Sequence, residues 1–401
     1  MSAALVACGG GGESPAARPN AIAHTLAKGH ANSLVNSHPR ALATEPTGAG
    51  ELVSARLIKT IAAREVAAEL ARVGPGYLSG LVARYDVASY RIEYLTTDGQ
   101  GKPITASGLI CVPIKRLGRA SPLVSYQHGT TFRDAEAPSN NAVASEPAPV
   151  MAALGAIVVA ADYVGYGVSK GAPHPYLLSA PTAAAVVDLL TAAKTWRAKN
   201  GVADNGQLFM VGYSEGGYAT MAAHRAMQAS ASPHLAQLVG TGPGGGPHHV
   251  GLTLDALLDY VRDQNKLLGA LINPGFLRHL GSTIRDEVRR NLIKAALPGD
   301  ADVVFQTSFI DNFLADDTHA IERDSNVHDW KPLAAVRLYH GRNDQTVPYA
   351  AATATLQAMK ARAAGSVLLT DCSAVPASHL ACVLPYFEYV LQQIAPVVRD
   401  L

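Results

Sequence analysis

Residues 212–217 read Gly212-Tyr213-Ser214-Glu215-Gly216-Gly217. An apolar run, Gln207 to Val211, comes directly before this segment, and a helical pattern, Tyr218 to Gln228, follows it. A serine on a tight turn between a strand and a helix adopts a strained backbone conformation, and glycines at both flanks remove side chains that would collide there. The hydroxyl then projects beyond the sheet, and the helix N-terminus stabilises negative charge beside it. The pattern therefore predicts Ser214 as a nucleophile.

The chain around this turn alternates short apolar runs with helical patterns. Pro122 to Tyr126 and Ala156 to Ala161 are apolar runs without alternation, and a helical stretch, Ser179 to Lys199, follows them. Such runs, separated by helices, are typical of a parallel sheet that is covered on both faces. The sequence thus predicts an α/β fold that opens with a hairpin of Tyr90 to Leu95 and Ile104 to Val112. Further elements are expected as helices at Glu51 to Ala71, Tyr349 to Ala363 and Cys382 to Val398, and as strands at Leu235 to Gly240, Val336 to Tyr339 and Ser366 to Thr370.

A serine hydroxyl is a weak nucleophile until a base takes its proton, so the chain must also supply a histidine and a carboxylate. On a strand–turn–helix scaffold of this kind the expected order is Ser, acid, His. Asp344 and His379 each follow one of the last two strand-like runs, and a final helix follows His379. We therefore predict Asp344 as the acid and His379 as the base. Asp371 precedes the last turn and His340 lies nearer the strand than the loop, which makes both weaker candidates.

The negative oxygen that forms during attack on a carbonyl needs two hydrogen-bond donors. One is predicted to be the backbone N–H of Glu215, the residue after the nucleophile. The second is expected from the loop after the strand Pro122 to Tyr126, where we assign Thr130, with Thr131 as the alternative. His128 in the same loop is expected to maintain its shape.

Almost a hundred residues separate the expected strands at Leu235 and Val336. They include helical patterns at Val250 to Ile272, Pro274 to Leu297 and Val303 to Leu314, and we place an inserted helical segment at about residues 247–328. Leu268 and Phe276 are candidates for an acyl pocket, as are Leu267, Leu271 and Ile272, although the same side chains would also serve simply to pack the insertion onto the sheet. Thr131 and Tyr213 are further candidates for substrate contact. His248 and His249 have no carboxylate or cysteine at ligand spacing, so no metal site is expected.

Composition excludes several classes of protein. The chain has 401 residues, and 33 Lys+Arg against 32 Asp+Glu give a net charge of +1, which does not suit a nucleic-acid binder. Hydrophobic residues make up 48% and charged residues 16%, so the chain can bury a large core. The longest apolar stretch, Val150 to Ala161, is too short to cross a bilayer as a helix.

The first fifty residues differ in composition from the rest. Leu5-Val6-Ala7-Cys8-Gly9 resembles the lipobox of bacterial lipoproteins, in which the cysteine is lipidated, although no positive region or full apolar region precedes it. We interpret residues 1–8 as the remnant of a lipoprotein signal, residues 9–50 as a Gly/Ala/Pro tether and residues 51–401 as the folded domain. Lipidated Cys8 would tether the protein to a membrane of the cell envelope; a disordered N-terminus on a cytoplasmic protein is the alternative.

Three other cysteines follow. Cys111 lies in an apolar run and is expected to be a buried thiol. Cys372 and Cys382 lie ten residues apart and without metal-ligand spacing. In an oxidising compartment they are able to close a small loop as a disulfide, and the alternative of two free thiols stays open.

The motifs together resemble a known family. Tyr126-Gln127-His128-Gly129-Thr130, Ala161 to Gly167, His174-Pro175-Tyr176-Leu177, residues 212–217 and the loops of Asp344 and His379 are similar to the α/β-hydrolase superfamily, and within it to the bacterial branch of the secretory lipases (Candida antarctica lipase A-like). The resemblance implies an eight-stranded, mostly parallel sheet with a helical cap, and hydrolysis of a small-molecule or lipid-like carboxylic ester without a cofactor. Glu215 departs from the small or amide residue common at its position, and either binds a cationic substrate group or pairs with a nearby base.

Two other functions remain as alternatives. A serine exopeptidase uses the same machinery and anchors a peptide N-terminus with carboxylates, for which Asp255, Asp259 and Asp263 in the insertion are candidates. A binding module without catalysis is the other alternative, although candidates exist here for every role of a Ser–Asp–His triad.

Overall fold

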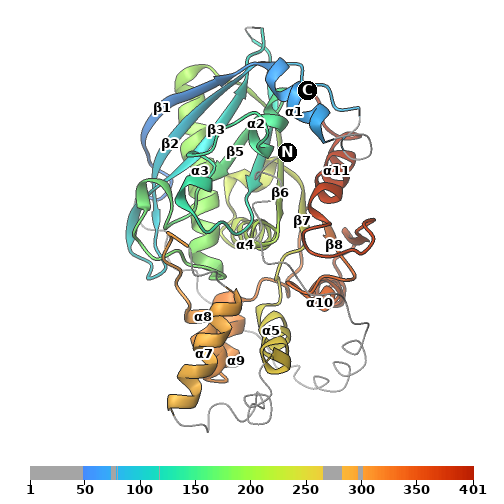
Figure 1. The fold of residues 1–401 in the computed structure, drawn as a ribbon. Helices are drawn as coiled ribbons and strands as arrows, with labels where there is room; N and C mark the ends of the chain where they lie inside the picture. Colours follow the sequence, from blue (N-terminus) through green and yellow to red (C-terminus); the bar gives the residue numbers. More distant parts are fainter. Residues whose placement is uncertain (1–47, 74–77, 79, 117, 265–281, 297–300) are drawn as a thin grey trace.

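The computed structural model describes residues 48–401 except 74–77, 79, 117, 265–281 and 297–300. One twisted sheet runs through it, with nine strands in the order β1-β2-β3-β5-β4-β6-β7-β8-β9 (Figure 1). Neighbours from β5 to β9 pair in parallel, and β1, β2, β3 and β5 pair antiparallel. The strands are β1 (Leu52–Ile61), β2 (Val87–Thr97), β3 (Pro103–Pro113), β4 (Ser121–Gln127), β5 (Ile157–Ala161), β6 (Asp204–Tyr213), β7 (Leu238–Gly244), β8 (Ala335–His340) and β9 (Val367–Asp371).

Helices fill the connections between the strands and form a separate group in the insertion. Those packed along the sheet are α1 (Ala63–Arg72), α2 (Pro147–Leu154), α3 (Ser179–Asn200), α4 (Glu215–Ala229), α10 (Tyr349–Ala361) and α11 (Val383–Ile394). Those between β7 and β8 are α5 (Val250–Gln264), α7 (Ser282–Ala296), α8 (Ser308–Leu314) and α9 (Thr318–Ala320). Within the described residues, no helix is both long and apolar enough to span a membrane.

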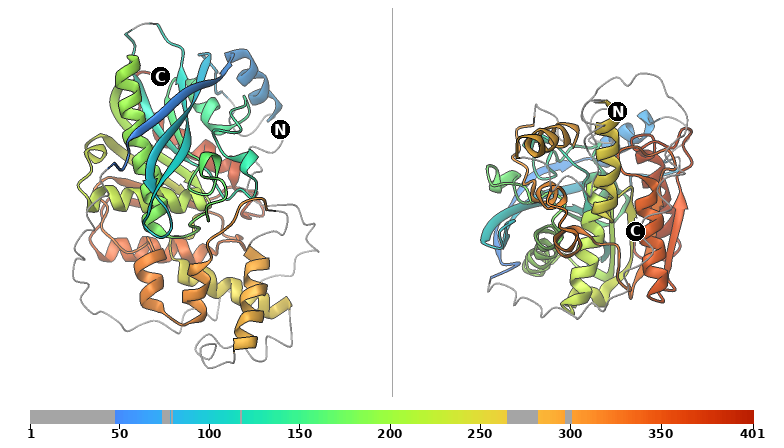
Figure 2. Two further views of the ribbon diagram at one scale, coloured as in Figure 1. Left: turned by 90° about the vertical axis from the view of Figure 1, so that its left-hand side faces the viewer. Right: turned by 90° about the horizontal axis from the view of Figure 1, so that it is seen from below.

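The two faces of the sheet bury alternate side chains of the same strands. Val124 and Val158 pack towards α1, α2 and α11, whereas Leu123 and Ile157 pack towards α3 and α4 on the opposite face (Figure 2). Because side chains alternate along a strand, a strand buried on both faces is mostly apolar on both. This explains the apolar run of β5 and the mostly apolar β4, in which Ser125 is a buried polar residue, and confirms the expected α/β fold with helices on both faces.

Two expectations were wrong at the start of the fold. The stretch from Glu51 to Ala71, expected to be one helix, divides into β1 and α1. This division also accounts for nine strands in the described sheet where eight were expected. β1 is an edge strand and most of its side chains are exposed, so burial imposes no period-two pattern on its sequence. The hairpin of β2 and β3 is confirmed as an antiparallel pair, and the strand expected at Leu235 begins three residues later, at Leu238.

The inserted helices lie beyond one end of the sheet. Figure 1 shows α5, α7, α8 and α9 grouped at the end where β7 runs on towards α5. β6 and β7 are parallel, so the turn after β6 opens at this same end. The insertion and residues 212–217 therefore meet at the carboxyl edge of the parallel strands.

Candidate active site

Ser214 occupies the sharp turn between β6 and α4. Its backbone has φ of 60° and ψ of −125°, a conformation that residues other than glycine rarely adopt. The N–H of Ser214 donates to Gly244 O at 2.8 Å, which ties the turn to the end of β7. Ser214 stands at the N-cap of α4, so the positive end of the helix dipole lies beside its hydroxyl.

Gly216 allows the end of β4 and the loop after it to approach this turn. A Cβ atom placed on Gly216 would lie 2.0 Å from Gln127 O and 2.8 Å from His128 O. We expect Gly216→Ala to lower the free energy of unfolding by about 3 kcal/mol, because the backbone at the end of β4 must move. Gly365→Ala is the matched control, since a Cβ there would meet no other part of the described protein within 4 Å, and its stability should change by less than about 0.5 kcal/mol. Urea unfolding of both variants checks this; equal stabilities would contradict it.

Three side chains from separate loops join in one hydrogen-bonded chain. His379 Nε2 lies 2.9 Å from Ser214 Oγ, and His379 Nδ1 lies 2.6 Å from Asp344 Oδ2. All three residues are buried. The arrangement lets the imidazole accept the serine proton while the carboxylate holds its other nitrogen.

Asp344 is bound on both carboxylate oxygens. Its Oδ1 accepts from the backbone N–H groups of Thr346 at 2.9 Å and Val347 at 2.8 Å, and His340 Nε2 lies 3.4 Å from Oδ2. Burial acts to raise the pKa of Asp344, but the charge and hydrogen bonds of His379 and His340 outweigh it and lower the pKa to about 2. Asp344 is therefore ionised at neutral pH, and its contribution to stability is lost as pH falls below about 4 towards 2.

The loop that carries His379 is fixed from several sides. A disulfide joins Cys372 to Cys382, the last residue before α11. The hydroxyl of Tyr213 donates to His379 O at 2.8 Å, and Asn343 N donates to Ala377 O at 3.1 Å. Tyr213 thus supports the histidine loop; its contact with substrate stays a prediction.

The two weaker candidates in the sequence do not contact Ser214: Asp371 lies at the surface, and His340 contacts Asp344. Asp371 is bound by Arg342 at 2.7 Å and by the hydroxyl of Tyr349 at 2.5 Å on the protein surface. His340 Nε2 lies 3.4 Å from Asp344 Oδ2, the oxygen that also contacts His379, and 2.9 Å from Val347 O. The geometry accordingly brings Asp344 and His379, and neither competitor, next to Ser214.

The loop after β4 lies beside the nucleophile turn. Thr130 and Thr131 are both buried. Thr130 Oγ1 lies 3.2 Å from the hydroxyl of Tyr176, and Thr131 O accepts from Tyr166 at 2.6 Å. His128 lies against two backbone carbonyls, those of Gly129 at 2.8 Å and Asp162 at 3.3 Å, and burial lowers its pKa. These contacts place His128 between the loop after β4 and the end of β5, a position that fits the role of maintaining the loop expected from the sequence.

Glu215 has a partner that the sequence analysis did not single out. Its Oε1 lies 2.7 Å from His174 Nε2, and both side chains are about 1% exposed. Of the two roles expected for Glu215, pairing with a nearby base is the one that the structure contains. A carboxylate buried in this way is not available to a cationic substrate group.

The sequence of this chain matches one known protein family. The family model described as "Secretory lipase" matches residues 143–383, which is more than half of the chain and includes Ser214, Asp344 and His379. The chain belongs to the secretory lipase family. No curated protein sequence matches this chain.

Solved structures agree on the fold. The rice cell wall degrading esterase LipA from Xanthomonas oryzae is 23% identical over 88% of this chain and 100% of its own, with a TM-score of 0.64. Candida antarctica lipase A in its closed state is 17% identical over 88% of this chain and 84% of its own, with a TM-score of 0.56. At such identities the likeness shows the fold alone, and this chain has the α/β-hydrolase fold.

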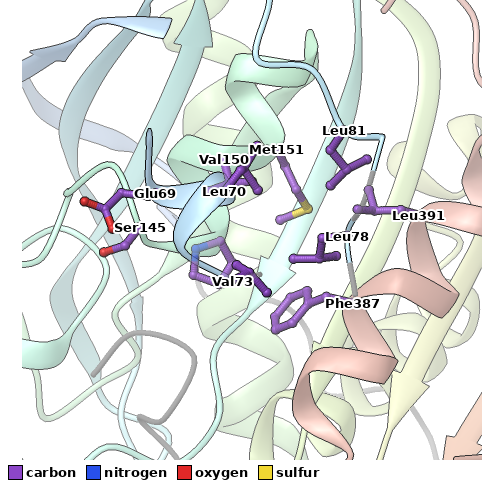
Figure 3. A pocket seen from close by; sticks show the side chains of 11 residues that line it. Glu69, Leu70, Val73, Leu78, Leu81, Ser145, Val150, Met151, Phe387 and Leu391 are labelled. Carbon is purple, nitrogen blue, oxygen red and sulfur yellow. The ribbon is translucent and has the colours of Figure 1, made fainter. Parts of the chain in front are cut away.

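Two pockets of the described protein lie outside the hydrogen-bonded chain. An apolar pocket opens between α1, α2 and α11 (Figure 3). A more polar pocket lies behind the loop after β4, where Thr131, Tyr213 and Glu146 are among its walls; burial raises the pKa of Glu146 to about 8 despite a hydrogen bond from Asn141. Neither pocket is lined by Ser214 or His379.

Other expected site residues lie in the insertion. Leu268 and Phe276 fall outside the described residues, as do Leu267, Leu271 and Ile272. Asp255 and Asp259 have interaction partners in the structure, and Asp263 is exposed. In the part of the chain that the structure describes, no group of three or more His, Cys, Asp or Glu side chains is placed to hold a metal ion.

Proposed function

We propose that this secretory lipase hydrolyses carboxylic esters through an acyl-enzyme on Ser214. The proposal is supported above all by the continuous contacts from Ser214 Oγ to His379 and from His379 to Asp344, at 2.9 and 2.6 Å. Ser214 Oγ attacks the ester carbonyl carbon while His379 Nε2 takes its proton. The imidazolium then protonates the leaving alcohol as the C–O bond breaks.

The second half of the cycle returns the enzyme to its starting state. His379 takes a proton from water, the resulting hydroxide attacks the acyl carbon, and the imidazolium returns the proton to Ser214 as the acid leaves. The negative oxygen in both halves is stabilised by the backbone N–H groups of Glu215 and Thr130, the donors expected from the sequence, with the Thr130 hydroxyl as a further donor.

The inserted segment, about residues 247–328, is proposed to cover this site and to select substrates. Its helices lie beyond the carboxyl edge of the parallel strands (Figure 1), and Val304 and Gln306 bond the backbone of His174, the partner of Glu215. Membership in the secretory lipase family supports a secreted or envelope location. Lipidation of Cys8 and the tether of residues 9–50 stay predictions, because the structure describes the chain only from residue 48.

A panel of chromogenic substrates tests the reaction class. We expect hydrolysis of p-nitrophenyl esters between acetate and palmitate, and rates at least about 100-fold lower on aminoacyl p-nitroanilides. The reason is that Glu215 is paired with His174, and that Asp255 and Asp259, two of the candidate anchors for a peptide N-terminus, already have interaction partners. Rates on the ester series then measure the acyl length that the site accepts. Faster cleavage of the anilides would replace the esterase proposal with the exopeptidase alternative.

A further inference from the structure

One short segment, His174 to Tyr176, contacts the side chains of both residues assigned as oxyanion donors. His174 Nε2 lies 2.7 Å from Glu215 Oε1, and the hydroxyl of Tyr176 lies 3.2 Å from Thr130 Oγ1. The segment comes just before α3 and is distant in sequence from both partners. Neither contact takes part in the proton transfers proposed for Ser214, His379 and Asp344.

The contact between His174 and Glu215 restrains the Glu215 side chain. His174 Nδ1 lies 2.9 Å from Val164 O, and because a carbonyl only accepts, Nδ1 must carry a proton. Nε2 and Glu215 Oε1 then share one further proton, whichever of them holds it. Glu215 is the first residue of α4, directly after Ser214, so a fixed side chain restrains the peptide N–H that is proposed as the first oxyanion donor.

The contact between Tyr176 and Thr130 orients the hydroxyl of Thr130, the second residue assigned as an oxyanion donor. Either hydroxyl is able to donate in this pair. When Tyr176 donates to Thr130 Oγ1, the Thr130 hydroxyl keeps its own proton for a different acceptor. The loop around Thr130 is otherwise held through backbone atoms, such as Thr131 O, which accepts from Tyr166 at 2.6 Å.

The segment is itself held by the insertion. His174 N donates to Val304 O at 2.7 Å, and Gln306 N donates to His174 O at 2.8 Å. The ring of Phe305 lies between these bonds, with its centroid 5.4 Å from that of His174 and 5.6 Å from that of Tyr176. Residues 304–306 therefore pack directly on the residues that contact the two oxyanion donors.

We propose that His174 and Tyr176 are positioning residues for the oxyanion hole: His174 fixes the Glu215 peptide through the Glu215 side chain, and Tyr176 orients the Thr130 hydroxyl. The inference rests on the proposed ester hydrolysis. It explains what holds the two oxyanion donors in place. It also connects the oxyanion hole directly to residues 304–306 of the insertion.

A double-mutant cycle tests the Tyr176 contact. Tyr176→Phe should lower kcat on p-nitrophenyl butyrate about 3- to 10-fold, the effect of one hydrogen bond, and change KM less than about 2-fold. Thr130→Val removes the hydroxyl that Tyr176 orients, so adding Tyr176→Phe to it should cause no further loss. The same loss in both backgrounds would show that Tyr176 acts independently of Thr130 and would overturn this half of the proposal.

Rescue by a conservative variant tests the His174 contact. Glu215→Ala should lower kcat about 10-fold or more with KM little changed. Glu215→Gln should stay within about 3-fold of the wild type, because its amide N–H is able to donate to Nε2 of neutral His174. Equal losses in both variants, or no loss in either, would overturn this half.

A control variant far from the site distinguishes a positioning role from a general loss of stability. The hydroxyl of Thr96 donates to Asp188 Oδ2 at 2.7 Å in a buried contact between β2 and α3, so Thr96→Val should lower the melting temperature and leave kcat unchanged. If Glu215→Ala lowers only the melting temperature, as Thr96→Val does, the pair has a structural role alone. An active wild type with unaffected variants overturns this inference only, whereas a wild type that hydrolyses no ester overturns the proposed function as well.

Discussion

Ser214→Ala is expected to lower kcat for ester hydrolysis by about four to six orders of magnitude. No acyl-enzyme can form without Oγ, and what remains is the slow attack of water in a site that still binds substrate. The serine side chain is buried and its oxygen contacts His379 Nε2, so the methyl group of alanine leaves the surrounding packing intact. KM should therefore change only a few-fold, and hydrolysis of p-nitrophenyl butyrate measures both constants.

A fluorophosphonate probe gives a second readout of the same residue. The wild type should gain one covalent adduct on the peptide that contains Ser214, and the alanine variant should gain none. Ser230→Ala is a matched control, because Ser230 caps the other end of α4 and its hydroxyl donates to the backbone carbonyls of Ala226 and Met227. Its labelling and kcat should equal those of the wild type. An adduct on Ser214→Ala, with hydrolysis preserved, would mean that another group is the nucleophile.

The nucleophile turn was predictable from sequence because the residues that it requires are consecutive, at positions 212–217. Gly216 must lack a side chain, since a Cβ there would lie 2.0 Å from Gln127 O, and the backbone of Ser214 is strained whatever surrounds it. Asp344 and His379 were predictable for a topological reason: both follow parallel strands, whose carboxyl ends meet at one edge of the sheet. Loop position and chain order were therefore enough to select them from many carboxylates and histidines.

The features that sequence analysis missed depend on contacts between distant residues. His174 belongs to one of the motifs that resemble the secretory lipases, but its pairing with Glu215 appears only when α4 brings that carboxylate to 2.7 Å from its ring. Glu215 itself gave the signal, as an acid at a position where a small or amide residue is common, but the sequence does not show which of the 14 histidines is its partner. β1 gave a weaker signal, because an exposed edge strand is not required to alternate.

Asp344→Asn is expected to lower kcat by about three to four orders of magnitude. Oδ1 of Asp344 accepts from the N–H groups of Thr346 and Val347, so the carbonyl oxygen of asparagine must take that place to satisfy both donors. The amide NH₂ then faces His379 Nδ1, at the position where Oδ2 now lies 2.6 Å away. An N–H there requires Nδ1 to be unprotonated, which puts the imidazole proton on Nε2, towards Ser214.

An imidazole in that tautomer is unable to take the serine proton, although its position is unchanged. The loss should therefore appear in kcat rather than in KM, and rates on p-nitrophenyl butyrate at saturation measure it. Asp371→Asn is the matched control, because Asp371 is the other carboxylate near His379 in sequence and it binds Arg342 and Tyr349 at the surface; its kcat should stay within about 2-fold. Loss of activity in Asp371→Asn with activity kept in Asp344→Asn would transfer the role of the acid to Asp371, and the loop of Asp371 would then have to rearrange before catalysis.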